Sequence, residues 1–289
     1  MATWSAPGKV FLFGEHAVVF GKPGVAMAIR PRVYVTVRRA KRTTDVKSPY
    51  LEECFCQMGV HGTLYVRSLL PSASGLGSSA AVTVATLCAI NDEFGLGHTR
   101  EEVSQLAFEI EKKVQKGRAS PTDTYVSSFG GLVLIDPTTK RRLPPQNFPL
   151  VIGNTGISHN TSHMLEMVAA FRKASPEIAL PLLDAIEGTT RKALHSLNNP
   201  KDLGNLMDVN HALLEALGVG HPVLSKLVLS ARAAGAFGAK LTGAGGGGCM
   251  VALCPSRLRS RVAGAIKACD ASPLITTIDT EGARKEKNV

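Results

Sequence analysis

The sequence contains few aromatic residues and no long apolar run. Aromatic side chains make up 5% of the 289 residues, with a single Trp, which is too few for a surface that stacks successive nucleic-acid bases. No uninterrupted apolar run reaches membrane-spanning length, and the first residues, Glu15 among them, lack the pattern of a cleavable signal. The sequence therefore predicts a soluble cytoplasmic protein without a membrane partner.

Cysteine and acidic residues are also limited. Cys54 and Cys56 have no second pair that would complete a zinc site, and the apolar setting of Cys88, Cys249 and Cys254 predicts buried or reduced thiols. Acidic residues number 23 against 33 Lys and Arg, a formal net charge of +10. The basic residues are scattered, so no nucleic-acid partner is predicted. A positive field also attracts a polyanionic small molecule, although a solvated basic surface explains most of the excess.

Glycine is abundant, and one glycine-bearing stretch is the most informative part of the chain. Residues 70–81 read Leu-Pro-Ser-Ala-Ser-Gly-Leu-Gly-Ser-Ser-Ala-Ala. A strand is predicted before it at Thr63–Arg67 and a buried helix after it at Ala80–Ile90. A helix N-terminus presents unpaired N–H groups and the positive end of its dipole, which suits an anion. The stretch therefore predicts a phosphate cradle made by Ser74, Gly75, Leu76, Gly77, Ser78, Ser79 and Ala80.

The cradle by itself leaves three interpretations open. No Lys-Ser or Lys-Thr follows Gly77, so the stretch is not a Walker A loop. It does fit Gly-x-Gly-x-x-Ala, a variant of the dinucleotide-binding fingerprint. The nearest acidic residues, Asp92 and Glu93, follow a helical run instead of a second strand. A kinase, a dehydrogenase and a plain structural turn are the alternatives.

Two further segments resemble the motifs of a known family. Residues 5–24 read Ser-Ala-Pro-Gly-Lys-Val-Phe-Leu-Phe-Gly-Glu-His-Ala-Val-Val-Phe-Gly-Lys-Pro-Gly, and residues 240–249 read Lys-Leu-Thr-Gly-Ala-Gly-Gly-Gly-Gly-Cys. With the stretch at 70–81, and in this order, they resemble the three motifs of the GHMP kinase superfamily. Within it, Gly14–Val19 and Arg118–Thr124 look most like the archaeal-type mevalonate kinases. The resemblance runs from Trp4 to about Leu253.

The resemblance implies an α+β protein with the two-domain GHMP kinase fold. It implies a ribosomal-protein-S5-like α/β half at residues 1–147 and a ferredoxin-like α+β half at residues 148–289. Periodicity predicts elements in the first half: strands at 10–13, 33–39, 63–67 and 132–135, and helices at 79–94 and 99–115. In the second half it predicts strands at 150–152, 240–241, 250–253 and 274–278, and helices at 162–173, 176–197, 203–217, 223–234 and 257–269. Residues 281–289 are expected to form a disordered basic tail.

The resemblance assigns catalysis to Asp123 and Lys9. Asp123 corresponds to the family's aspartate at the substrate hydroxyl, where an ionised carboxylate accepts the hydroxyl proton or orients the hydroxyl. Lys9 corresponds to the motif-one lysine, whose charge lowers the pKa of the hydroxyl and stabilises charge on the transferred phosphoryl group. Simpler readings of the same residues are a helix cap for Asp123 and a surface lysine with an extended stem for Lys9.

The resemblance also implies a magnesium ion. Mg²⁺ prefers oxygen ligands and retains water, and Ser79 matches the family's serine ligand. We choose Glu111, on the helix before Asp123, as the carboxylate ligand. Glu109 lies about 200° around the helix axis from it, so the two are not expected to serve one site together. The spacing from Glu111 to Asp123 is one residue longer than in the family, and Lys116 is the apparent insertion. Glu111 keeps the position of the family's ligand if the end of the helix accommodates the extra residue.

The predicted metal ligands have structural alternatives. Ser78 or Ser79 could be only the N-cap of the helix. The two glutamates could be solvent-facing partners of Lys112 and Lys113. The motif at 119–124, Ala-Ser-Pro-Thr-Asp-Thr, departs from the Pro-Ser-Gly-x-Asp-Asn that is common in the family, so an asparagine's contribution is missing.

Substrate binding is expected from the first and third motifs. Glu15 and His16 match the motif that the family associates with mevalonate, and a histidine can donate to a substrate carboxylate or hydroxyl. Thr242 is expected to hydrogen-bond the reacting hydroxyl or a phosphate, and Gly243 to permit close backbone approach. A satisfied core histidine and a flexible glycine linker are the competing readings.

Together these resemblances imply a mevalonate kinase activity. The expected reaction transfers the γ-phosphate of ATP to the C5 hydroxyl of (R)-mevalonate and gives 5-phosphomevalonate and ADP for isoprenoid synthesis, with Mg²⁺ bound. The nearest alternatives are phosphomevalonate kinase and mevalonate 3-kinase, and more remote ones are an NAD-dependent dehydrogenase and a non-catalytic nucleotide sensor. ATP and mevalonate are the expected partners. A homodimer is a hypothesis at the level of the family only.

Overall fold

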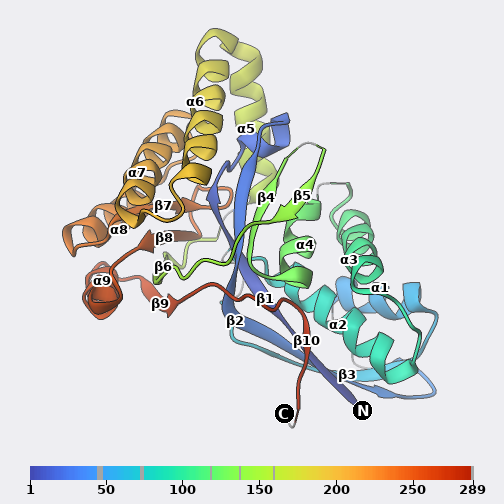
Figure 1. The fold of residues 1–289 in the computed structure, drawn as a ribbon. Coiled ribbons are helices and arrows are strands. Elements are labelled where there is room, and N and C mark those ends of the chain that lie inside the picture. Colours follow the sequence, from blue (N-terminus) through green and yellow to red (C-terminus); the bar gives the residue numbers. More distant parts are fainter. Residues whose placement is uncertain (44–47, 72–74, 118, 137, 159, 288–289) are drawn as a thin grey trace.

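Two antiparallel sheets organise the chain (Figure 1). The structure is a computed structural model that describes residues 1–43, 48–71, 75–117, 119–136, 138–158 and 160–287. Within these residues, one sheet has six strands in the order β10-β1-β2-β4-β5, with β3 paired to β2, and the other has four in the order β7-β8-β6-β9. The predicted α+β class is therefore confirmed. None of the helices in the described part of the chain has the length and apolarity needed to cross a bilayer.

Two long strands form the centre of the larger sheet. β1 (Ala2–Phe13) and β2 (Gly24–Arg39) pair along most of their lengths. The first residues of β2 pair with β4 (Leu132–Ile135), and its second half pairs with β3 (Gly62–Ser68). β4 also pairs with β5 (Lys140–Arg142). β2 therefore pairs with three strands, β1, β3 and β4, and joins the two parts of this sheet.

Four helices lie on one side of the long strands (Figure 1). They are α1 (Pro49–Met58), α2 (Ser78–Phe94), α3 (Arg100–Val114) and α4 (Pro121–Phe129). α2 packs on β1 and β2, and most of its residues between 80 and 90 are buried, as its small apolar composition predicts. This packing places the N-terminus of α2 beside β1.

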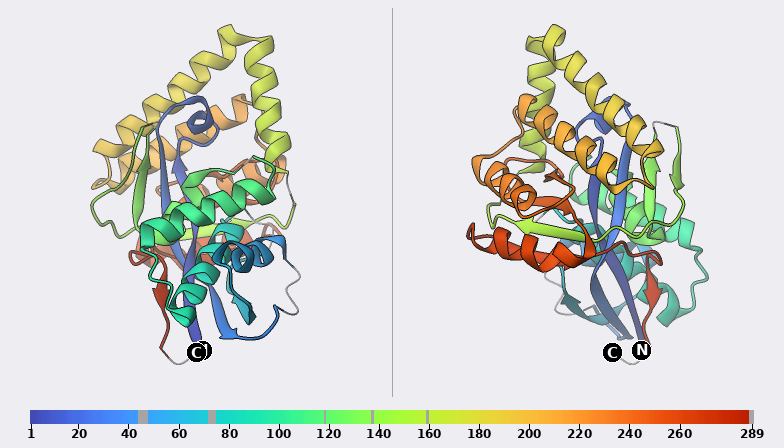
Figure 2. Two further views of the ribbon diagram at one scale, coloured as in Figure 1. Left: turned by 90° about the vertical axis from the view of Figure 1, so that its right-hand side faces the viewer. Right: turned by 60° about the vertical axis from the view of Figure 1, so that its left-hand side comes forward.

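The smaller sheet has its own helical cover. Its strands are β6 (Leu150–Asn154), β7 (Gly238–Thr242), β8 (Cys249–Leu253) and β9 (Ser272–Thr276). The helices of this half are α5 (Thr161–Ala174), α6 (Pro176–His195), α7 (Pro200–Ala216), α8 (Pro222–Ala233) and α9 (Arg259–Lys267). Short 3-10 turns occur at Ala17–Phe20 and Ser256–Leu258. Both views of Figure 2 show α5 and α6 extending away from the sheets.

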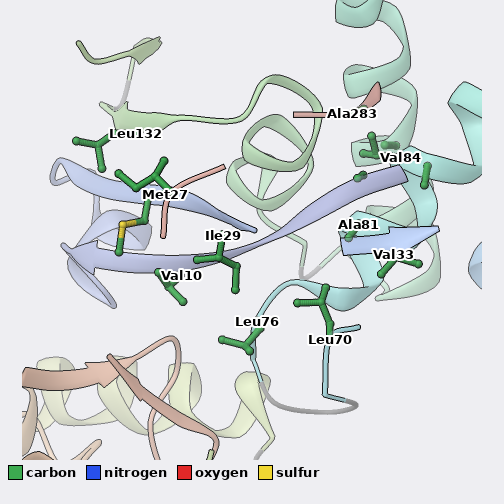
Figure 3. Close-up of a cluster of buried hydrophobic side chains, with 14 of the residues drawn as sticks. Val10, Met27, Ile29, Val33, Leu70, Leu76, Ala81, Val84, Leu132 and Ala283 are labelled. Atoms are coloured by element: carbon green, nitrogen blue, oxygen red, sulfur yellow. The ribbon is translucent and has the colours of Figure 1, made fainter. Parts of the chain in front are cut away.

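The largest hydrophobic cluster joins the sheet to the predicted phosphate loop (Figure 3). Val10 and Ile29 from the long strands lie near Leu70, at the start of the glycine-bearing stretch, and Leu76 within it, and all four side chains are buried. Burial of such side chains contributes about 1.5–3 kcal/mol each. The stretch is therefore held against the sheet by apolar contacts at Leu70 and Leu76.

The C-terminal residues are not a disordered tail. β10 (Arg284–Lys285) pairs with Trp4 and Ser5 of β1. Arg32, which is 2% exposed, pairs with Asp279 and also donates to the carbonyl of Gly282. Basic composition suggests a solvated tail, but the edge of β1 has backbone groups that this segment pairs. The prediction is therefore wrong for residues 281–287, and residues 288–289 lie outside the described part. The boundary at 147/148 stays a prediction.

Candidate active site

The glycine stretch turns tightly against β1 at the start of α2. Gly75 and Gly77 have φ values of +75° and +73°, and Gly77 is the N-cap of α2. A Cβ atom on Gly77 would lie 2.9 Å from Cγ of Lys9, and the carbonyl of Leu76 accepts a hydrogen bond from the Lys9 amide at 2.8 Å. Glycine is therefore needed at 77 for both backbone conformation and close approach. Ser74 lies outside the described residues.

Most residues that the sequence singled out line one cleft of about 490 Å³. These residues are Lys9, Glu15, His16, Gly75, Gly77, Ser78, Ser79, Glu111, Asp123 and Gly243. Leu76, Ala80 and Thr242 do not line it. The side chains of Leu76 and Ala80 are buried in the hydrophobic core, so only their backbones remain candidates for phosphate contacts. Residues more than 200 positions apart are thus brought together.

Lys9 and Asp123 form an ion pair in the cleft. The distance from Lys9 Nζ to Asp123 Oδ2 is 3.2 Å, and the Lys9 side chain is 7% exposed whereas that of Asp123 is 26% exposed. The Lys9 ammonium also lies 5.1 Å from the centre of the Phe11 ring. Lys9 is therefore a buried, paired lysine and not a surface lysine.

Asp123 is not the residue that caps its helix. The N-cap of α4 is Ser120, whose hydroxyl accepts a hydrogen bond from the amide of Thr122. Asp123 lies in the first turn, where a carboxylate interacts favourably with the helix dipole. Its carboxylate is therefore free of capping and lies against Lys9.

Glu111 is buried at the wall of the cleft beside the start of α2. Its Oε1 atom has no hydrogen-bond partner. Burial, followed by the nearby charge of Asp123, raises the pKa of Glu111 to about 7, while a hydrogen bond with Ser79 and the charge of Lys9 oppose that shift. Neither Ser78 nor Ser79 caps α2 with its side chain. A serine hydroxyl thus lies beside a buried carboxylate with one unpaired oxygen.

Lys116, the apparent insertion before Asp123, lies in the turn that follows α3. It has φ of +53°, and the amide of Gly117 donates to the carbonyl of Lys112 at 2.7 Å, which closes this turn. Glu111, near the C-terminal end of α3, lines the cleft. Glu109 is exposed and accepts a hydrogen bond from Gln105. The alternative of solvent-facing partners of Lys112 and Lys113 is therefore wrong for Glu111. Glu109 does face solvent, but Lys113 pairs with Glu53.

Glu15 and His16 present hydrogen-bond acceptors. Glu15 Oε1 pairs with the buried ammonium of Lys240, and Glu15 Oε2 has no partner. His16 Nε2 lies 2.9 Å from the carbonyl of Ala244, so the proton belongs on Nε2. Burial lowers the pKa of His16, which favours the neutral ring, and Nδ1 has no partner. The expected donor at His16 is therefore used by Ala244, and Nδ1 is left as an acceptor.

Comparison with known proteins supports the sequence resemblance. Family profiles match at residues 37–131 for the GHMP kinases N terminal domain and at residues 190–270 for the GHMP kinases C terminal domain. A protein of Thermococcus gammatolerans named mevalonate kinase is 38% identical to this chain over 98% of both chains. The chain belongs to the GHMP kinase family. The mevalonate kinase of Methanothermobacter thermautotrophicus is 40% identical over 87% of this chain and 89% of its own length.

Solved structures show the same GHMP kinase fold. The mevalonate kinase of L. major in complex with R-mevalonate has a TM-score of 0.87 and 26% identity, over 96% of this chain and 95% of that one. The Lactococcus lactis galactokinase complexed with galactose has a TM-score of 0.81 and 20% identity, over 99% and 95%. At that identity the likeness shows the fold alone.

Thr242 of this GHMP kinase holds the two sheets together. Its hydroxyl accepts a hydrogen bond from the Phe11 amide at 2.9 Å and donates to the Phe11 carbonyl at 3.0 Å. The side chain is buried, at 4% exposure. The proton and one lone pair of this hydroxyl are therefore used by β1, and a contact of Thr242 with substrate or phosphate stays a prediction.

Replacing Thr242 by Val is expected to lower stability more than turnover. The change leaves the buried amide and carbonyl of Phe11 unpaired, which costs about 1–3 kcal/mol of unfolding free energy. Denaturant unfolding and kcat per folded molecule would be measured together. A loss of kcat with unchanged unfolding free energy would return Thr242 to substrate contact.

The polar residues that sequence reasoning missed include two in the wall of the cleft and one behind that wall. Tyr50 on α1 and Gln115 at the end of α3 line the wall, and Lys240 lies behind Glu15. Ser48 and Pro49 followed by Gly59 are a helix start and stop signal for α1, so Tyr50 could have been placed on a helix. No local pattern pairs Lys240 with Glu15.

Proposed function

We propose that this GHMP kinase is a mevalonate kinase that transfers the γ-phosphate of ATP to the C5 hydroxyl of (R)-mevalonate. The observation that carries the proposal is the pair of buried Lys9 and partly exposed Asp123 beside the glycine turn at the N-terminus of α2. Full-length relatives named mevalonate kinase support the choice of substrate. ATP and mevalonate are then the two ligands of the cleft.

The phosphates of ATP fit the N-terminus of α2. Gly75, Gly77 and Ser78 line the cleft where the helix begins, and the free amides of a first helical turn attract anions. The left-handed glycines let the backbone approach a phosphate closely. The proposed γ-phosphate position is therefore within reach of Lys9.

Asp123 and Lys9 would act at the reacting hydroxyl. During transfer the C5 oxygen bonds to the γ-phosphorus while the bond from that phosphorus to the β,γ-bridging oxygen breaks, and ADP leaves. Asp123 accepts the proton of the reacting hydroxyl or orients that hydroxyl. The Lys9 ammonium stabilises negative charge on the hydroxyl and phosphoryl oxygens. Their 3.2 Å separation lets both groups serve one oxygen.

Ser79 and Glu111 fit a magnesium ion. The buried Oε1 of Glu111 has no protein partner, and a carboxylate with a hydroxyl is the oxygen donor set that Mg²⁺ accepts alongside water and phosphate oxygens. The ion, when bound, supplies charge neutralisation for the phosphates of ATP. The protein's part is to hold the two donors beside the glycine turn.

Replacing Glu111 by Gln is expected to raise the magnesium concentration needed for half-maximal activity. The amide keeps the side-chain shape but removes the charge that a hard cation prefers. A magnesium titration at saturating ATP measures the change, with Glu109→Gln as the matched control on the exposed face of α3. Equal magnesium curves for wild type and Glu111→Gln would remove Glu111 from the metal site.

The raised pKa of Glu111 also predicts a pH-dependent stability in magnesium-free buffer. The pKa is about 7 in the folded chain against an ordinary value of 4.5, so the folded state holds the proton more tightly than the unfolded state. This contribution favours folding below pH 4.5 and is lost as pH rises from 4.5 to 7. Wild type should therefore lose unfolding free energy relative to Glu111→Gln across that window. A difference that is constant with pH would contradict the burial argument.

The cleft suits mevalonate better than its phosphorylated product. Among the described residues that line it, Lys9 is the single Lys or Arg. A phosphomevalonate kinase must bind one more phosphate on the acceptor, and Arg or Lys partners are the usual means. The charge distribution therefore favours an acceptor without a phosphate.

Parallel assays of four acceptors test the proposal. ATP-dependent phosphorylation would be measured with mevalonate, 5-phosphomevalonate, homoserine and galactose in the presence of magnesium, and phosphorus NMR would locate the new phosphate. We expect a C5 monophosphate from mevalonate alone. Product from another acceptor would keep the phosphate site but overturn the substrate assignment. No product from any acceptor would favour a nucleotide sensor. A homodimer and a cytoplasmic location stay predictions.

A further inference from the structure

A buried lysine that the proposed reaction does not use lies behind the cleft. Lys240 of β7 is fully buried, and its ammonium donates to Glu15 Oε1 and to the carbonyl of Leu241 at 2.7 Å. Burial lowers the pKa of Lys240, and the Glu15 carboxylate opposes that shift. A charge buried this deeply persists only when it is paired. Lys240 is not among the described residues that line the cleft.

The pair belongs to a set of contacts between the third motif and the first. Lys240 and Thr242 are two residues apart on a strand, so their side chains share one face of β7. Thr242 binds the backbone of Phe11, and the carbonyl of Ala244 lies 2.9 Å from His16 Nε2. Residues 240–244 thus hold residues 11–16 at three places, and Lys240 provides the contact to Glu15.

Glu15 has one oxygen held and one oxygen unused. Its side chain is 1% exposed, it lines the cleft, and Oε2 is buried without a partner. An unpaired buried acceptor costs stability unless a ligand or water completes it. The arrangement is that of a preorganised acceptor for a substrate hydroxyl.

We propose that Lys240 is a positioning residue that holds Oε1 of Glu15, so that Oε2 is turned to receive a hydroxyl of the acceptor substrate. This inference rests on the proposed function. Without the ammonium, the Glu15 side chain would lose the partner that holds Oε1 and would rotate toward water. That rotation removes the acceptor from the cleft, although Lys240 itself never touches the substrate.

Kinetics of Lys240→Met test the inference. Methionine has a similar length without the charge. We expect the KM for mevalonate to rise by about tenfold to a hundredfold, the range for loss of a hydrogen bond to a charged group, with little change in the KM for ATP. The matched control is Arg32→Met, which breaks the other buried ion pair, Arg32–Asp279, outside the cleft wall. The control should lower the melting temperature and leave the KM for mevalonate unchanged.

A double-variant cycle with Glu15→Gln separates positioning from a structural role. If Lys240 acts through Glu15, Lys240→Met adds little to the KM for mevalonate once Glu15 is Gln. The Glu15→Gln, Lys240→Met double variant has no buried charge at the pair, and Glu15→Gln keeps an amide oxygen that accepts from the Lys240 ammonium. Where Lys240→Met alone does not fold, the comparison of these two variants decides. Equal rises of KM in both backgrounds, or a loss of stability alone as in Arg32→Met, would overturn the inference.

The wild-type assay separates this inference from the proposed function. If wild type phosphorylates mevalonate and Lys240→Met binds it normally, the positioning role alone fails. If wild type phosphorylates a different hydroxyl acceptor, the proposed function fails, and the same cycle with that acceptor still supports or overturns the role of Lys240.

Discussion

Asp123→Asn is expected to lower kcat by about 10²- to 10⁴-fold, the range for loss of a positioned general base. The amide keeps the shape of the side chain but cannot accept the proton of the reacting hydroxyl. Asp123 pairs with Lys9, and its proposed role is at the reacting hydroxyl and not at the phosphates of ATP, so ATP affinity should remain close to that of wild type. Single-turnover kinetics and ATP titration calorimetry measure the two quantities separately.

Asp184→Asn is the matched control for this change. Asp184 is an exposed aspartate on α6 that pairs with Lys22, so its loss removes a charge without touching the cleft. We expect wild-type turnover from the control. Turnover of Asp123→Asn within a few-fold of wild type would show that Asp123 has no part at the reacting hydroxyl.

Lys9→Met is expected to lower kcat by about 10²- to 10³-fold, as for loss of one group that stabilises charge in the transition state. The Lys9 ammonium is held by Asp123 and by its position 5.1 Å from the Phe11 ring, so it needs no reorganisation during transfer. The KM for mevalonate should change less than kcat, because the charge that Lys9 stabilises grows only as the reaction proceeds.

Steady-state kinetics with both substrates, and a melting curve, test Lys9→Met. Lys22→Met is the control, since Lys22 pairs with Asp184 and Glu187 away from the reacting groups. A fall in melting temperature large enough to unfold Lys9→Met under assay conditions would point to a structural role. A folded variant with wild-type kcat would exclude Lys9 from transition-state stabilisation.

Local pattern was sufficient where short-range physics decides the structure. The glycines at 75 and 77 adopt the left-handed conformations that the loop requires, and α2 follows at the expected place. Helix geometry separated Glu111 from Glu109, and burial of Glu111 in the cleft agrees with that choice. The catalytic, metal and substrate roles stay predictions that the variants above address.

Local pattern failed where long-range contacts decide. Residues 281–287 look like a basic tail, yet β10 pairs with β1 and Arg32 pairs with Asp279. No local pattern shows that the Thr242 hydroxyl, expected at phosphate or substrate, binds the backbone of Phe11. In both cases the partner is more than 200 residues away, and no helical or strand period reports on such a distance.

The sequence by itself determined the family, through its three motifs, and the α+β fold class. It also determined the left-handed turn at Gly75 and Gly77 before α2, because glycine conformation and helix start signals act within a few residues. Only the tertiary structure decided the states of the polar groups. It showed that Lys9 is paired with Asp123, that Ala244 uses the His16 donor, and that Lys240 holds one oxygen of Glu15. Charge state and hydrogen-bond direction depend on burial and on neighbours from distant segments, which exist only once the two sheets have packed together.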